Sequence, residues 1–269
     1  MVGITIIMTT YLAQLNPHER DEHIAFDEGP HIYYVDGDPS FTSVTKWNHQ
    51  HFKPFNASLI IRKMMNSKKW SRSKYFGKTA QEIKDGWSKS GQEAAAAGTK
   101  LHYDIECFWN MCANKNDSVE YQYFLNFNKQ FPLKPYRTEW TIWDKEHKLS
   151  GSVDFIAENE DGTLTIYDWK RSKEIKKFNN FDSAITPCIN HLPDANFWHY
   201  VLQLNTYRKI IENNYDKKIH EMYLVCLHPN KPNFQRIKVP RLEEEMNELF
   251  KERKKSITKS ITESIVVNS

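Results

Sequence analysis

Two aspartates and a lysine lie in strand-like segments joined by a turn. Asp154 belongs to the first segment, Asp168 and Lys170 belong to the second, and residues 159–162 (Asn-Glu-Asp-Gly) have the composition of a turn. Folding the strands about this turn places Asp154 opposite Asp168 or one residue from it. Because strand side chains alternate between faces, Asp168 and Lys170 share a face, and the two carboxylates are expected about 5 Å apart.

Two carboxylates at this separation repel each other by about 3 kcal/mol at an effective dielectric constant near 20. A divalent cation with oxygen ligands would offset the repulsion, and Lys170 adds positive charge on the same face. Such a cation polarises a phosphoryl oxygen and acidifies a bound water, which the lysine can orient. The alternative is an exposed hairpin with solvated charges. The apolar neighbours Val153, Ile166 and Trp169 favour a strand inside a sheet, where unpaired charges are costly.

Two further pairs of residues are spaced four apart, which places each pair on one face of a helix. His102 and Glu106 offer an imidazole and a carboxylate, which suit borderline and hard metal ions. Gln203 and Tyr207 offer an amide and a phenol that could hydrogen-bond phosphates or position Lys170. Each pair alone is also typical of an ordinary helix, so only the combination with the carboxylates is specific.

The order of these motifs resembles a known family. The chain reads G-T-x-L-H-x-x-x-E over 98–106, then Glu139, G-x-x-D over 151–154, D-W-K over 168–170 and Q-x-x-x-Y over 203–207. This resembles the PD-(D/E)XK nuclease superfamily in its RecB-like branch. Within that branch it looks like the mitochondrial-genome-maintenance exonucleases and, more loosely, the CRISPR-associated RecB-like exonucleases. The resemblance covers roughly residues 98–207 and implies a restriction-endonuclease-like core.

The resemblance also implies a Mg²⁺ or Mn²⁺ site and a role for each matching residue. It implies metal ligation by His102, Asp154, Asp168 and the main chain of Trp169, and a catalytic set of Asp154, Asp168, Lys170, Glu106, Gln203 and Tyr207. Glu139 matches a further acidic position of the branch. Val153 stands where the superfamily name has proline, as is common in this branch. Only Cys226 follows Tyr207, so the iron–sulfur cluster of many RecB-like nucleases is not expected.

The elements that must position these residues follow from periodicity and turn signals. Strands are predicted at 31–35, 41–44, 136–143, 149–157, 163–169, 221–226 and 234–239, and helices at 57–110, 117–131, 196–213 and from 241. Within 57–110, a new helix is predicted to begin at Gly98, with Thr99 near its N-cap. The buried face of this helix is predicted to consist of Leu101, Ile105, Phe108 and Cys112. The last dozen residues are expected to fray.

This element order predicts a mixed α/β domain, with helices flanking one central mixed sheet and an N-terminal helical extension. The predicted divisions are an N-terminal DNA-guiding region over 1–95, the nuclease core over 96–240, and a C-terminal helix with a flexible tail over 241–269.

A basic stretch precedes the motifs. Seven cations between Arg62 and Lys78 have no acidic residue among them, and aromatic residues are interleaved. Cations follow a phosphate backbone and aromatics stack on unpaired bases, so the stretch predicts a DNA-guiding helical element with a preference for single-stranded DNA. A solvated basic helix is the alternative. The predicted DNA contacts are Lys68, Lys69, Trp70, Arg72, Lys74, Tyr75 and, after the D-W-K motif, Ser172.

Composition limits the other possibilities. The 37 Lys+Arg against 34 Asp+Glu give +3, so nucleic-acid binding requires a local patch. No apolar run approaches the roughly 20 residues of a membrane span. The four cysteines form no C-x-x-C motif, which favours reduced thiols in a cytoplasmic or nuclear protein. A viral or phage origin is left open. The leading hypothesis is a metal-dependent DNA exonuclease. A structure-specific endonuclease and a catalytically decayed binding module are the alternatives.

Overall fold

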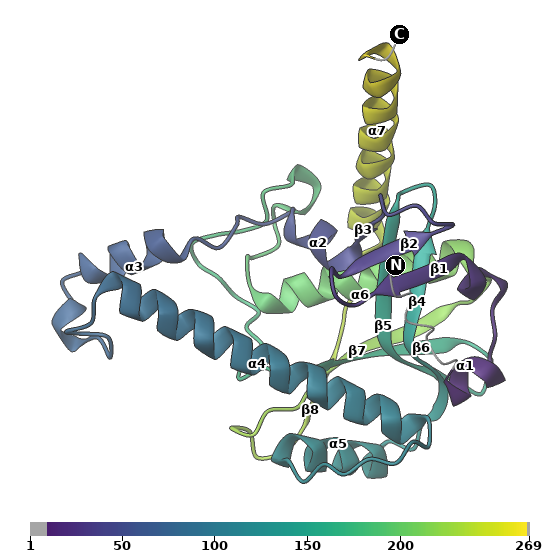
Figure 1. Ribbon diagram of the computed structural model, residues 1–269, viewed down its shortest axis with the longest axis horizontal. Coiled ribbons are helices and arrows are strands. Elements are labelled where there is room, and N and C mark those ends of the chain that lie inside the picture. Colours follow the sequence, from purple (N-terminus) through teal and green to yellow (C-terminus); the bar gives the residue numbers. More distant parts are fainter. Residues whose placement is uncertain (1–9, 268–269) are drawn as a thin grey trace.

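The computed structural model describes residues 10–267, which fold around one mixed six-stranded sheet flanked by helices (Figure 1). The sheet strands are β3 (Thr42–Ser43), β4 (Lys134–Asp144), β5 (Leu149–Glu158), β6 (Leu164–Lys170), β7 (Ile219–Cys226) and β8 (Gln235–Lys238). A separate hairpin pairs β1 (Ile24–Asp27) with β2 (Ile32–Val35). The predicted mixed α/β class is confirmed.

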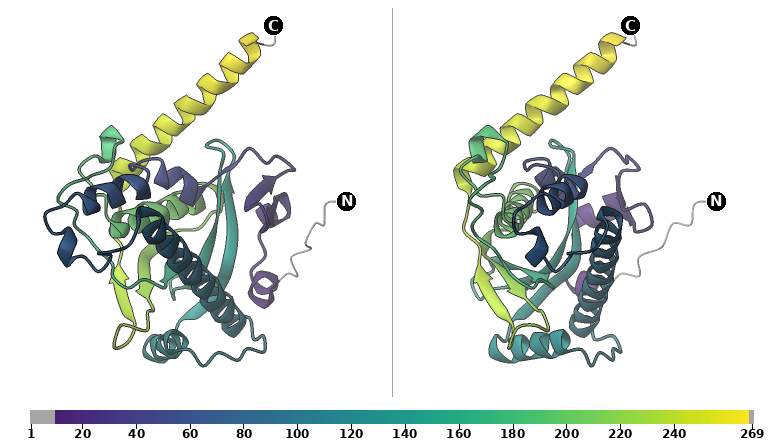
Figure 2. Two further views of the ribbon diagram at one scale, coloured as in Figure 1. Left: turned by 60° about the vertical axis from the view of Figure 1, so that its left-hand side comes forward. Right: turned by 90° about the vertical axis from the view of Figure 1, so that its left-hand side faces the viewer.

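The helices cover the sheet and extend beyond it. They are α1 (Tyr11–Leu15), α2 (Val44–His49), α3 (Ala57–Met65), α4 (Ala80–Trp109), α5 (Val119–Gln130), α6 (Asn196–Asn214) and α7 (Glu243–Val267), with 3₁₀ turns at Glu19–His23, Trp70–Arg72 and Pro187–Ile189. Helix α3 and the first half of α4 project away from the sheet, and α7 projects in another direction (Figures 1 and 2). Among the described residues, no helix is long and apolar enough to cross a membrane.

The strands around β5 leave part of one of its edges open. Strand β4 pairs with the whole length of β5, from Leu149 to Glu158. The opposite edge of β5 pairs with the parallel strand β3 only at residues 149–150 and with the antiparallel strand β6 only at 155–158. Residues 151–154, which include the predicted ligand Asp154, therefore lie where the neighbouring strands diverge.

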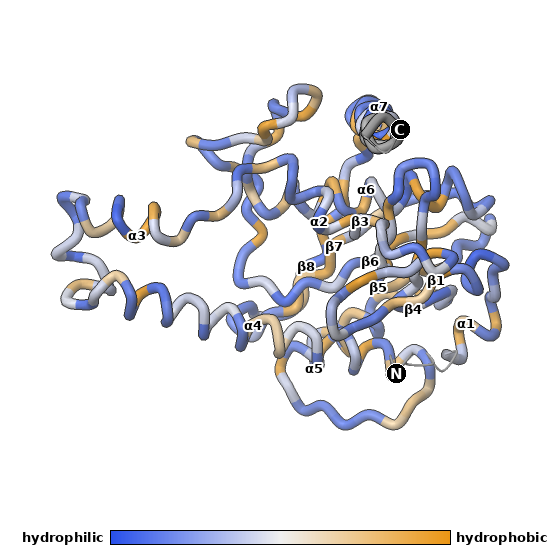
Figure 3. The backbone as a smooth tube through the Cα atoms, turned by 45° about the horizontal axis from the view of Figure 1, so that its top comes forward, coloured by the Kyte–Doolittle hydropathy of each residue, from blue (hydrophilic) through white to orange (hydrophobic). Residues whose placement is uncertain are grey.

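The sheet separates two hydrophobic cores, so its central strands are buried on both faces. Val153 and Leu224 pack into the core that contains α6, whereas Phe155 and Val225 pack into the core that contains α4 and α5. Strands buried on both faces read as nearly continuous apolar runs. In Figure 3 hydrophobic residues accordingly concentrate along the sheet.

Most predicted elements of the core are present, with bounds shifted by at most two residues. The meander β4–β5–β6 is antiparallel, and the observed pair Phe155–Tyr167 confirms the register predicted from the turn. Strand β6 then pairs in parallel with β7, which follows α6.

The predicted helix start at Gly98 is wrong. Helix α4 runs unbroken from Ala80 to Trp109, and its N-terminal cap is Thr79, which forms a capping box with Glu82. Glycine costs only about 1 kcal/mol in a helix interior, which cannot end a helix of 30 residues. Leu101 and Ile105 are buried as predicted, but Cys112 is exposed beyond the helix end, and Cys107 is buried instead.

Helix α7 continues through the C-terminal segment to Val267, and residues 268–269 lie outside the described part. The fraying of the last dozen residues stays a prediction. Thr258 and Thr262 donate their hydroxyl hydrogens to the carbonyl oxygens of Lys254 and Thr258 at 3.0 Å, which satisfies these polar side chains within the helix.

Candidate metal centre

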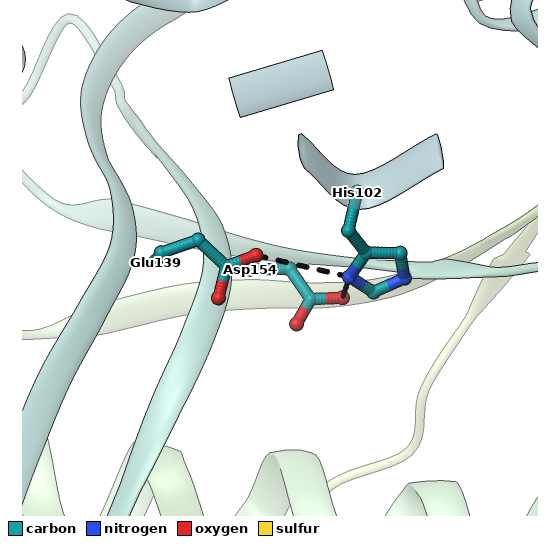
Figure 4. Close-up of side chains that lie close together, drawn as sticks. All are labelled: His102, Glu139 and Asp154. Carbon is teal, nitrogen blue, oxygen red and sulfur yellow. Dashed lines mark ion pairs between the residues drawn. The ribbon is translucent and has the colours of Figure 1, made fainter. Parts of the chain in front are cut away.

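Three side chains from three elements converge at the open edge of β5. His102 comes from α4, Glu139 from β4 and Asp154 from β5, and one ligand atom of each lies within 4.8 Å of the others (Figure 4). The Nδ1 atom of His102 lies 3.6 Å from Asp154 Oδ2 and 3.7 Å from Glu139 Oε1. This group could hold a metal ion.

The main chain of Trp169 fixes two of these residues. Its N–H donates a hydrogen bond to Asp154 Oδ2 at 2.9 Å, and its carbonyl oxygen accepts one from His102 Nε2 at 2.8 Å. Because Nε2 carries the proton of this bond, Nδ1 is the ring atom that faces the two carboxylates. Trp169, predicted as a main-chain ligand, thus lies in direct contact with both His102 and Asp154.

Glu139 reaches the site through an unusual backbone conformation. Its φ of 42° lies in the left-handed region, which costs energy for a residue with a side chain. Ser152, across the strand pair, donates its hydroxyl hydrogen to Glu139 Oε2 at 2.9 Å. The chain therefore keeps a strained residue where its carboxylate meets His102 and Asp154.

Asp168 and Lys170 complete the site on β6. Asp168 is 2% exposed, and Lys170 Nζ lies 2.7 Å from its Oδ2 atom. The Oδ2 atom of Asp168 is thus paired with the lysine ammonium, whereas its Oδ1 atom is buried and has no hydrogen-bond donor. Asp168 is not part of the three-residue group, but its register places it next to Asp154 across the diverging strands.

Burial and mutual charge shift the pKa values of these groups. Burial raises the pKa of Asp168 and that of Asp154, against the opposing effect of the nearby Lys170. Burial would lower the pKa of His102, but the charges of Asp154 and Glu139 outweigh it and raise this pKa to about 9. Burial would also lower the pKa of Lys170, but the two aspartates raise it.

Glu106 lies one turn beyond His102 on α4. Burial and the charge of Glu139 raise the pKa of Glu106 to about 7. The predicted His102–Glu106 pair is thus directed toward the same acidic region, although Glu106 does not belong to the three-residue group.

Helix α6 supplies the remaining predicted residues. Gln203 Nε2 donates a hydrogen bond to Tyr207 Oη at 3.1 Å, and Tyr207 is 3% exposed. Its ring lies against Gly151, where a Cβ atom would be 2.8 Å from Tyr207 Cε1, so this position has no room for a side chain. Tyr200, which the sequence analysis missed, lies with its ring centroid 4.9 Å from Lys170 Nζ. Its spacing of three from Gln203 could have revealed it.

The predicted DNA contacts lie outside this site. Lys68, Lys69, Trp70, Arg72, Lys74 and Tyr75 lie between α3 and α4, at the far end of the projection (Figure 1). This stretch is a 3₁₀ turn and loops rather than one helix, and Trp87 Nε1 donates a hydrogen bond to Tyr75 Oη at 2.8 Å. Ser172 follows β6 and donates its hydroxyl hydrogen to the carbonyl of Glu174.

The donor set fits a hard or borderline divalent cation. One imidazole nitrogen and several carboxylates suit Mg²⁺ or Mn²⁺ better than a soft metal, which prefers thiolates. The unpartnered Oδ1 atom of Asp168 points to the same conclusion, because a buried carboxylate oxygen almost always has a partner. All four cysteines are free thiols, and none belongs to the three-residue group.

Comparisons with known proteins give distant structural similarities only. No family model matches this chain, and no curated protein matches it. The crystal structure of SSO0001 is similar, with 14% identity and a TM-score of 0.36 over 81% of this chain and 76% of that chain. The structure of a "Putative exonuclease" from Eubacterium rectale is similar, with 9% identity and a TM-score of 0.31 over 82% and 79%. Similarities at this level do not indicate an activity for this chain.

Proposed function

We propose that this protein is a metal-dependent nuclease that hydrolyses phosphodiester bonds of DNA. The observation that carries this proposal is the buried Asp168, which lies next to the group His102, Glu139 and Asp154. Its Oδ2 atom pairs with Lys170, and its Oδ1 atom has no partner. A site that only stabilised the fold would have completed the hydrogen bonding of Oδ1 within the chain. A cluster of carboxylates with one half-buried lysine suits a cation-bridged phosphate.

In this proposal the residues divide into ligands and helpers. His102, Asp154 and Asp168 hold the cation together with the Trp169 main chain, and Glu139 joins them. A bound Mg²⁺ or Mn²⁺ would polarise a phosphoryl oxygen and acidify a water molecule. Lys170 orients the attacking water and stabilises charge that grows on the phosphate. Gln203 and Tyr207 support the lysine and the DNA, and Glu106 adds a further carboxyl.

The finer assignment is an exonuclease that prefers single-stranded DNA. Two features support it: the motif order over 98–207, and the basic stretch 62–78 at the end of the α3–α4 projection. Unpaired strands expose bases to the interleaved aromatics, whereas duplexes offer mainly phosphates. A structure-specific endonuclease uses the same chemistry, and a decayed binding module would keep the fold without cleavage.

A cleavage assay separates these three possibilities. The purified chain is incubated with single-stranded DNA labelled at either end, with end-blocked strands and with circles, in Mg²⁺, Mn²⁺ or EDTA. An exonuclease cuts open strands in the presence of metal, spares circles and releases label from one end first. Cleavage of circles would identify an endonuclease. Absence of cleavage under all conditions would overturn the proposed function.

A further inference from the structure

Two phenylalanines stand almost fully exposed in the connection between β6 and α6. Phe178 is 81% exposed and Phe181 is 92% exposed, the largest values among the exposed large hydrophobic residues that the structure describes. Leaving a phenylalanine side chain in water forgoes about 1.5–3 kcal/mol of burial free energy. Two such residues three positions apart offer apolar area that a ligand could cover.

The connection that carries them is held in place by hydrogen bonds. Asn196 accepts from the backbone N–H of Lys176 at 2.7 Å and donates to the carbonyl of Glu174 at 2.9 Å. Asn179 donates to the carbonyl of Asp194 at 2.7 Å and accepts from the backbone N–H of Phe181 at 3.0 Å. Both phenylalanines therefore extend from a backbone anchored to the start of α6 rather than from a loose loop.

Lysines precede the two rings in the chain, and Asp182 follows them. Lys173, Lys176 and Lys177 are exposed, and the only acidic residue between Lys170 and Phe181 is Glu174. The Glu174–Lys176 contact is 3.7 Å long and solvent-exposed, so it neutralises little of this charge. Exposed aromatic rings flanked by lysines favour a ligand with flat faces and a negatively charged backbone.

The position of the connection links it to the candidate site. It begins directly after Lys170, whose Nζ contacts Asp168. Its middle part lies against the end of α2, where the backbone N–H of Ile185 donates to the carbonyl of His51 at 2.8 Å and Lys53 pairs with Asp182 at 2.5 Å. The two rings therefore follow Lys170 within eleven residues along the chain.

We propose that Phe178 and Phe181 form a platform on which unpaired bases of a single-stranded DNA substrate stack, while the adjacent lysines hold its phosphates. This rests on the proposed nuclease function, because it assigns the platform to the strand that passes the same site. Duplex DNA gains little from the platform, since its bases are already stacked on each other.

The test measures binding without cleavage. Fluorescence anisotropy follows a labelled single strand of about 20 nucleotides, longer than the usual site of one binding module, and the matching duplex, both in Ca²⁺. The double variant Phe178→Ala/Phe181→Ala is expected to bind the single strand about tenfold or more weakly and the duplex with nearly unchanged affinity, with the salt dependence preserved because no cation is removed.

Two control variants sharpen the result. Phe178→Tyr/Phe181→Tyr keeps the rings and should bind like the original chain, whereas Phe178→Leu/Phe181→Leu keeps the apolar surface but should fail like the alanine variant. Leu15→Ala changes an exposed apolar residue on α1 and should have no effect. Full binding by the leucine variant, or equal losses for single strand and duplex, would overturn the platform.

The two proposals fail separately. A chain that cuts DNA normally, and whose alanine variant binds as tightly as the original, keeps its nuclease function and loses the platform. If the alanine variant loses single-strand binding but the original chain never cuts DNA, the platform is supported and the nuclease function is not.

Discussion

Two buried aspartates in the same sheet show opposite chemistry. Asp144 at the end of β4 and Asp168 on β6 are each 2% exposed. Asp144 accepts hydrogen bonds from the backbone N–H and the Nδ1 of His147, both at 2.9 Å, and from Asn214 Nδ2 at 3.2 Å. Asp168 has the Lys170 ammonium 2.7 Å from its Oδ2 atom, and its Oδ1 atom has no partner.

The pKa values of these two residues move in opposite directions. Burial would raise the pKa of Asp144, but the hydrogen bonds from His147 outweigh burial and lower it. Burial raises the pKa of Asp168, and the neighbouring Asp154 adds to that effect. An unpartnered buried charge is costly. Asp144 is fully paired within its own chain, whereas Oδ1 of Asp168 has no partner there. We infer that a cation pairs with this atom.

The largest expected effect is on cleavage, and it separates the two aspartates. Asp168→Asn should slow DNA cleavage by about a thousandfold or more, because it removes a charged oxygen ligand. The matched variant Asp144→Asn should cut within about threefold of the original rate once folded. Single-turnover rates in Mg²⁺ measure both. Comparable losses for the two variants would erase the functional distinction.

Lys170, the partner of Asp168, should affect rate rather than binding. Lys170→Ala is expected to cut at least about a hundredfold more slowly, the loss typical of one group that stabilises transition-state charge. Its DNA affinity in Ca²⁺ should stay near that of the original chain, because the interaction is realised mainly in the transition state. Lys170→Arg should not restore activity, since a planar guanidinium does not replace a compact ammonium. A variant that binds weakly yet cuts normally when saturated would make Lys170 a phosphate anchor.

The basic stretch offers a third kind of charge, solvated rather than buried. Replacing Lys68, Lys69, Arg72 and Lys74 by glutamine should weaken single-stranded DNA binding about tenfold and flatten its salt dependence. Cleavage of a very short strand should suffer less than that of a long one. A binding titration at several salt concentrations is the measurement, and an unchanged slope would assign the stretch to ordinary solvated surface.

The smallest effect concerns the stability that Asp144 provides. Because its folded pKa is lowered, its contribution is fully present above the unfolded pKa of about 3.9 and is lost as the pH falls through the folded value. Asp144→Asn should therefore cost about 1–3 kcal/mol of unfolding free energy at pH 7 and much less near pH 2.5. Urea unfolding at both pH values tests this. A cost independent of pH would contradict the role given to the hydrogen bonds from His147.

The parts of this site that the sequence predicted correctly depend on residues that are close together in the chain. The register of Asp154 and Asp168 followed from a short turn between adjacent strands, and the i,i+4 pairs followed from helical spacing. Such relations need no knowledge of the rest of the fold. The predicted helix start at Gly98 is wrong because the helical propensity of the residues on both sides outweighs the small free-energy cost of one glycine inside a helix.

Features set by long-range packing were not predictable in the same way. Glu139 was noted as acidic, but its left-handed φ and its contact with His102 depend on how β4 meets α4. Tyr33, on the separate β1–β2 hairpin, lies near enough for Glu139 and Asp154 to add to the burial that raises its pKa, yet no spacing in the sequence connects it to them. The exposure of Phe178 and Phe181 also became visible only with the fold.

Metal-dependent thermal stability tests the central claim most directly. Melting temperatures are measured for the original chain, Asp168→Asn and Asp144→Asn, each with EDTA and with Mn²⁺. At about a hundredfold excess over the dissociation constant, Mn²⁺ should raise the melting temperature of the original chain and of Asp144→Asn by about 5 °C or more. Asp168→Asn should show little response to Mn²⁺ and, in EDTA, should be at least as stable as the original chain. An unresponsive original chain, or an equal response in Asp168→Asn, would contradict the assignment of Asp168 to a cation site.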